Sequence, residues 1–187
     1  MVFLGRILPH KGIHHLIVGL PEDCPLQVIG PIGSADYLER LKRLAAGKQV
    51  AFLHGLSDAE IAGRLRRAAV LVHPTPTGPE GSAGANELLG LAVLEAMASN
   101  CPVVVSNAAS LPELVVHETS GLIIPPNDPD AIRGAIRRVI ADPGLWTALA
   151  VAARHRVEEK FVWPKVVERC LRAYGLCGAR PGDEFGR

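Results

Sequence analysis

Short apolar runs alternate along the chain with longer stretches in which apolar residues recur every three or four positions. The short runs predict six β-strands: Val2–Leu4, Leu26–Gly30, Val50–Leu53, Val70–His73, Pro102–Ser106 and Leu122–Ile124. The periodic stretches predict helices over 12–20, 35–46, 57–68, 91–99, 129–141, 143–159 and 162–172. Strands that are apolar throughout are typical of a parallel sheet covered on both faces. The pattern therefore predicts an α/β fold with a doubly wound, Rossmann-like parallel sheet.

Local signals fix several of the predicted helix ends. Ser57 and Glu60 have the spacing of a capping box, and Asp128 and Asp142 each precede a proline at the favoured first helical position. In doubly wound sheets, ligands bind at the carboxyl ends of the strands, where the strand order reverses. The segments expected at that edge are 5–12, 30–34, 54–58, 73–91 and 106–113.

Composition narrows the function classes. The 187 residues suit one domain or slightly more, and a net charge of +1 gives no basic surplus for nucleic acid. Four scattered cysteines without a C-x-x-C pair favour a reduced, cytoplasmic protein. Every apolar stretch is broken before the roughly 20 residues that a membrane span needs. We expect a domain over 1–174 and a mobile tail over 175–187, in a chain that begins within a strand like a piece of something longer.

The turn after the first predicted strand, Gly5-Arg-Ile-Leu-Pro-His-Lys-Gly12, combines two cations with two glycines. Glycines permit close approach of a ligand to the backbone, and Arg6 and Lys11 would attract an anion such as pyrophosphate. The Walker A order of Gly-Lys-Ser/Thr is absent. A solvated basic turn without a ligand is the alternative.

A second feature is the pair Glu87 and Glu95, separated by seven mostly apolar residues. Glu95 is the only charge from Leu88 to Ser99, so we expect its carboxylate to be at least partly buried and to need a hydrogen-bonding partner, such as sugar hydroxyls. Gly90-Leu91-Ala92 is predicted to begin a helix, whose amides would favour phosphate. Alternatively, Glu87 is an exposed loop acid and Glu95 pairs with a core arginine.

Other candidates are weaker. The small residues of Ser106–Glu113 would allow a ligand near the backbone, but an ordinary connection explains them equally well. No histidine spacing with a nearby acid supports zinc, and a G-x-S-x-G nucleophile elbow is absent.

Taken in order along the chain, these segments resemble the C-terminal domain of the group 1 glycosyltransferases, retaining enzymes of the GT-B fold. The matching segments, any one of which is weak alone, are Phe3–Arg6 with Lys11-Gly12, Gln27–Gly30, Val50–Gly55, Val72–Pro74, Glu87-x7-Glu95 through Ala98, Pro102–Ser106, Leu111–Glu113 and Gly121–Pro126.

The resemblance implies roles for individual residues. Arg6 and Lys11 match the cations that hold the donor diphosphate, Glu87 matches the acid at the donor sugar, and Glu95 matches the acid at the ribose. Gly90, Leu91 and Ala92 match the amides near phosphate, and the segment 51–54, with Phe52, would lie by the nucleobase. The implied chemistry is transfer of a hexosyl unit from a UDP-, GDP- or ADP-sugar to an acceptor hydroxyl with retained configuration, without a metal or another cofactor.

The chain departs from the family pattern in three places. The usual Glu-Gly-Phe-Gly is Glu87-Leu-Leu-Gly90, a Gly-Gly turn is Ala108-Ala109, and the family's N-terminal acceptor-binding domain is expected to lie outside these 187 residues. We expect such a domain to act in cis or in trans, and the chain alone to bind nucleotide sugar weakly and transfer little. A stand-alone nucleotide-sugar-binding module or subunit and a GT-B epimerase stay open. A Rossmann dehydrogenase is disfavoured because 5–12 lacks G-x-G-x-x-G.

Overall fold

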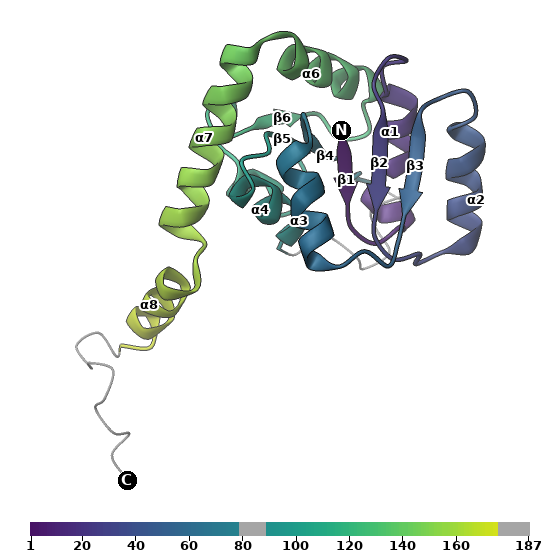
Figure 1. Ribbon diagram of the computed structural model, residues 1–187. Coiled ribbons are helices and arrows are strands. Elements are labelled where there is room, and N and C mark those ends of the chain that lie inside the picture. The colour runs from purple at the N-terminus through teal and green to yellow at the C-terminus, as the bar shows by residue number, and fades with distance from the viewer. Residues whose placement is uncertain (79–88, 176–187) are drawn as a thin grey trace.

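Six parallel strands form one sheet in the computed structural model of the chain, which describes residues 1–78 and 89–175. The strands are β1 Val2–Leu4, β2 Leu26–Ile29, β3 Val50–Leu53, β4 Leu71–His73, β5 Val103–Ser106 and β6 Leu122–Ile124. Their order is β3-β2-β1-β4-β5-β6, and all five neighbouring pairs are parallel. The predicted doubly wound sheet is therefore confirmed, with every strand end within one residue of its expected position (Figure 1).

Within the described residues, seven helices lie where the sequence predicts them, and the short helix Leu111–Leu114 and the 3-10 turn Pro9–Lys11 are additions to that pattern. The helices are α1 Ile13–Gly19, α2 Ala35–Leu44, α3 Asp58–Arg67, α4 Leu91–Ala98, α5 Leu111–Leu114, α6 Pro129–Ala141, α7 Pro143–Lys160 and α8 Trp163–Ala173, with a 3-10 turn η1 at Pro9–Lys11. The capping box of α3 forms in full: Ser57 Oγ accepts the amide of Glu60, and the Glu60 carboxylate accepts the amide of Ser57 at 2.8 Å. Asp128 and Asp142 cap α6 and α7 as expected.

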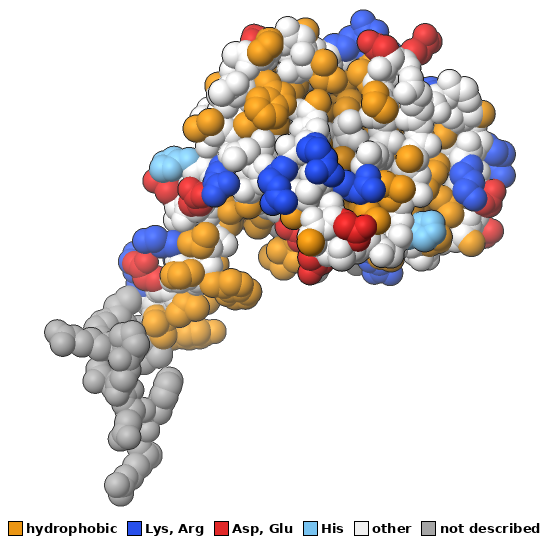
Figure 2. Space-filling model, viewed as in Figure 1, with side chains coloured by type: hydrophobic (Ala, Val, Ile, Leu, Met, Phe, Trp, Pro, Cys, Tyr) orange, Lys and Arg blue, Asp and Glu red, His pale blue; other side chains and the backbone are white. Residues whose placement is uncertain are grey.

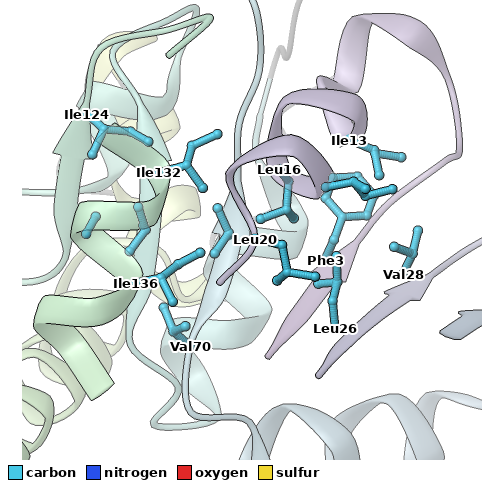
Figure 3. Packing of buried hydrophobic residues seen from close by; sticks show 14 of the residues in the cluster. Phe3, Ile13, Leu16, Leu20, Leu26, Val28, Val70, Ile124, Ile132 and Ile136 are labelled. Atoms are coloured by element: carbon cyan, nitrogen blue, oxygen red, sulfur yellow. The ribbon is translucent and has the colours of Figure 1, made fainter. Parts of the chain in front are cut away.

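Two apolar clusters cover the two faces of the sheet. On one face, α1, α2 and α6 enclose a cluster that includes Phe3, Leu16 and Ile136, and Figure 3 shows α1 and α6 packed side by side over it. On the other face, α3 and α4 enclose a cluster that includes Leu65 and Met97. Helix α7 joins the two, because its early residues pack on the first cluster and its later ones on the second. Burying both faces explains why the strands are apolar throughout.

Helix α8 contributes little to this core. None of its residues is buried, and Trp163, Val167 and Leu171, spaced at four-residue intervals, lie exposed along one side. It projects from the end of α7, away from the sheet (Figures 1 and 2). Among residues 1–78 and 89–175, none of the helices combines the length and the apolar character that a bilayer crossing requires.

Candidate functional site

The reversal of strand order lies between β1 and β4. The chain leaves β1 through α1 toward β2 on one side, whereas β4 leads through α4 to β5 on the other. In doubly wound sheets the ligand crevice lies at such a reversal, between the segments that follow the two diverging strands. These segments are the turn 5–12 and the region from His73 to the start of α4, of which residues 79–88 lie outside the described residues.

The turn 5–12 lies closely against the turn that follows β2. Ile7 N donates to Pro31 O at 2.9 Å, and Gly33 N donates to Ile7 O at 3.2 Å. A Cβ added at Gly30 would lie 2.1 Å from Gly5 O, so only glycine allows the two backbones to approach this closely. The backbone on either side of Arg6 is thus fixed, while the Arg6 side chain is exposed.

Gly12 ends this turn and joins it to the end of β4. It lies in the left-handed region (φ 67°), caps α1 and would place a Cβ only 1.9 Å from Pro74 O. Lys11, directly before it, is half-buried, and Arg6 has no hydrogen bond or ion pair with any residue in the described part of the chain. The turn after β1 therefore carries two cations, and the guanidinium of Arg6 is available to an anion.

The start of α4 forms the other side of the crevice. Gly90 is its N-cap in the left-handed region (φ 59°), and Leu91 and Ala92 are the first helical residues, as predicted. A Cβ at Gly90 would meet Leu114 at 2.6 Å and Leu111 at 3.2 Å, both from α5. The short helix α5, which begins within the segment 106–113 that the sequence analysis treats as a turn, thus supports the N-terminus of α4.

Glu95 lies on the outer side of α4, not in the core. The residue as a whole is exposed, so the expected partial burial holds only for its partly desolvated carboxylate, and no arginine pairs with it in the described part of the chain. Neighbouring atoms still strip some water from the carboxylate, and this desolvation, together with the negative charge of Asp58 at the start of α3, raises its pKa above the usual value for glutamate. An uncompensated acid therefore stands between α3 and α4, open to a hydrogen-bond donor.

The remaining predicted site residues have different outcomes. Glu87 lies outside the described residues. Phe52 is half-buried and packs against the cluster under α1 and α2, opposite Val28 in the strand register. Its ring therefore packs toward the core, whereas Ala51 and His54 of the segment 51–54 are exposed.

A polar junction at the end of β4 escaped the sequence analysis. Ser106 Oγ donates to Thr75 O at 2.6 Å, and the side-chain amide of Asn127 pairs with the backbone of Thr77 at 2.9 and 3.2 Å. Ser106 is the last residue of β5, whereas Thr75, Thr77 and Asn127 lie two to four residues beyond the ends of β4 and β6, so no regular spacing marked them in the sequence. These bonds fix the path of the chain as it leaves β4 beside Gly12. Within the described ranges, no group of three or more His, Cys, Asp or Glu side chains is placed to hold a metal ion.

A model of the family described as "Glycosyl transferases group 1" matches residues 1–156. The chain belongs to that family. Among curated relatives of this group 1 chain, an uncharacterized glycosyltransferase of Methanocaldococcus jannaschii is 31% identical over 94% of the chain and 44% of its own length. A GDP-mannose-dependent phosphatidylinositol monomannoside mannosyltransferase of Mycolicibacterium smegmatis is 33% identical over 87% of the chain and 44% of its own length. The chain thus spans under half the length of these relatives.

Solved structures confirm the fold of this group 1 domain. The Anabaena protein HepE, in complex with UDP-glucose, superposes with a TM-score of 0.81 at 23% identity, over 94% of this chain and 48% of that one. The C-terminal domain of a group 1 glycosyltransferase from Francisella tularensis superposes with a TM-score of 0.70 at 24% identity, over 87% and 85%. The expectation of the C-terminal half of a GT-B protein is therefore confirmed as a fold.

Proposed function

We propose that this chain is the donor-binding half of a retaining glycosyltransferase, and that it holds a nucleotide sugar in the crevice between β1 and β4. In this proposal, Arg6 and Lys11 bind the diphosphate and the amides of Gly90, Leu91 and Ala92 lie beside it. Glu95 accepts hydrogen bonds from the ribose hydroxyls and Glu87 contacts the sugar. The backbone near Phe52 lies by the base.

One observation carries the proposal: the family match spans both sides of the strand-order reversal, where the exposed Arg6 and the N-cap of α4 flank the same crevice. The relatives support the ligand class, since one is named for its use of GDP-mannose and a structural neighbour was solved with UDP-glucose. The raised pKa of Glu95 fits a carboxylate that lacks a partner until a hydroxyl donor arrives.

The proposed cations and helix amides would help a nucleoside diphosphate to leave when its bond to the sugar breaks. Cations and amide dipoles fixed around the diphosphate stabilise the negative charge that develops as the bond to the sugar breaks, without reorganisation during the reaction. Transfer of a hexosyl unit to an acceptor hydroxyl, with retention at the anomeric carbon, would follow once an acceptor-binding domain is present in cis or in trans. We propose that no metal is needed, so binding should persist in EDTA.

Titration of the chain with UDP, GDP, ADP and their sugars tests the proposal. A ligand that binds the folded state raises the melting temperature, by an amount that grows with concentration over Kd. Arg6→Ala should weaken every diphosphate, whereas Arg40→Ala, which removes an exposed arginine of α2, should not. Absence of any shift up to millimolar concentrations of all three nucleotide classes would overturn the proposal.

Activity and location are separate parts of the proposal. We expect little transfer by the chain alone; robust transfer would contradict the dependence on a second domain, and binding without transfer even with that domain would favour a binding module.

We also propose a cytoplasmic location, because Cys24, Cys101 and Cys170 are free thiols. Cell fractionation with thiol labelling checks this.

A further inference from the structure

One buried oxygen joins the first turns of α1 and α2. Tyr37 Oη accepts the backbone N–H of His14 at 3.2 Å and lies 2.8 Å from Nδ1 of the same residue. Tyr37 is 4% exposed and His14 is 5% exposed, and their rings meet edge to face. The amide can only donate to Oη, whereas the tautomer of His14 decides which of Oη and Nδ1 donates in the second contact.

Both ends of this contact lie beside the proposed diphosphate turn. His14 follows Gly12 by two residues, so it lies in the first turn of α1, directly after the turn that carries Arg6 and Lys11. Tyr37 follows the turn 30–34, which pairs with the backbone of Ile7, and its own amide donates to the N-cap Ser34 at 3.3 Å. The two turns and two helix starts therefore form one connected unit, and the Tyr37–His14 contact is a side-chain tie within it.

The hydrogen bond between Tyr37 and His14 is suited to orienting α1 more than to stabilising the fold. Tyr37 belongs to the apolar cluster under α1, α2 and α6, together with Ile13 and Leu41. A phenylalanine would fill nearly the same volume there, and a buried neutral hydrogen bond contributes a net stability of only about 1 kcal/mol. What apolar packing cannot supply is direction, since burial of apolar area is non-directional. A hydrogen bond to the α1 backbone sets where that helix starts.

We propose that Tyr37 is a positioning residue of the donor site: acting through His14, it holds the turn 5–12 so that Arg6 and Lys11 converge on the diphosphate. The inference rests on the proposed function and adds a residue to that site. Tyr37 does not touch the ligand in this account. It acts only by placing the cations of the turn. Its loss should therefore raise the Kd for a nucleoside diphosphate, which loss of a purely structural residue should not.

Tyr37→Phe removes one oxygen and tests the idea. Binding of the nucleoside diphosphate that the wild-type chain prefers is measured by calorimetry, well below the melting temperature. The Kd should rise about five- to tenfold, the loss expected when one hydrogen bond no longer orients the site. In an Arg6→Ala background the same change should raise Kd by clearly less than in the wild type, because only Lys11 is then left for the turn to position.

Two further variants sharpen the result. Ser120→Ala removes a buried hydroxyl that accepts the amide of Val116 at 2.9 Å, outside the site, and should lower the melting temperature without changing Kd. His14→Asn keeps an acceptor near the position of Nδ1 and should bind more tightly than His14→Leu. This comparison carries the test if Tyr37→Phe does not fold.

The outcomes separate the two proposals. If the wild-type chain binds and Tyr37→Phe binds equally well, or loses as much in the Arg6→Ala background, the positioning role is overturned and the proposed function stands. If His14→Asn and His14→Leu bind alike, the role is likewise overturned. If the wild-type chain binds none of the nucleoside diphosphates, the proposed function itself fails.

Discussion

Replacing Gly12 with alanine should be among the most damaging single-methyl changes in this protein. Gly12 has φ 67° and ψ 18°, a conformation that alanine adopts only at a cost of about 1–2 kcal/mol. In addition, the new Cβ would lie 1.9 Å from Pro74 O and 3.2 Å from the Pro76 ring. The nearest obstacle is backbone, so it cannot move aside as the tip of a flexible side chain would.

The size of the effect follows from these distances. To reach an ordinary contact, the Pro74 carbonyl or the start of α1 must retreat by roughly 1.5 Å, and forced shifts of this kind in a packed interior typically cost about 1–3 kcal/mol. With the backbone cost, the loss is about 2–5 kcal/mol, a large part of the 5–15 kcal/mol that holds a typical domain folded. The shift would also separate the two sides of the proposed crevice, so nucleotide affinity should fall.

Gly47→Ala is the matched control. Gly47 has φ 78°, so alanine there carries the same kind of backbone cost, but no atom lies within 4 Å of the added Cβ. Urea unfolding should show a loss of about 1–2 kcal/mol for Gly47→Ala and a clearly larger one for Gly12→Ala, with nucleotide binding impaired only in the latter. Equal losses in the two variants would refute the reasoning that the contact with Pro74 decides the outcome.

Four further predictions concern the site and the periphery. Because its folded-state pKa is raised, Glu95 destabilises the fold above that pKa; Glu95→Gln should therefore equal or exceed wild-type stability at pH 7, with the difference vanishing below about pH 4 in thermal melts. Glu95→Ala should weaken every nucleotide sugar, whereas Glu87→Ala should spare free nucleoside diphosphate; equal losses in titrations of both variants would contradict the assigned roles. Ser57→Ala should cost about 1 kcal/mol in urea unfolding by removing the cap of α3. Truncation after Val162 should leave the melting transition nearly unchanged, since α8 has no buried residue, and a large drop would show that α8 supports the core.

The strands could be predicted closely because burial on both faces leaves little choice of residue. Val103–Ser106, for example, is buried at every position, and only apolar runs satisfy such an environment. Helix starts could be predicted equally well where the sequence contains a typical N-capping residue, as at Ser57 and Asp128. The two missed elements, η1 and α5, are three and four residues long, too short to show helical periodicity.

The position of Glu95 could not be predicted because α4 lacks the polar stripe that normally marks an outer face. Leu91, Glu95 and Ala98 follow the i, i+4, i+7 spacing and all are exposed, whereas Val93, Ala96 and Met97 face the sheet. The apolar neighbours that suggested a buried carboxylate are thus neighbours in sequence, on the opposite side of the helix. The neighbouring charge that helps raise the pKa of Glu95 is that of Asp58 at the start of α3, and tertiary packing alone brings the two together. An open acid beside an exposed Leu91 is also what the proposed site requires, because a ribose could not reach a carboxylate already enclosed by the core.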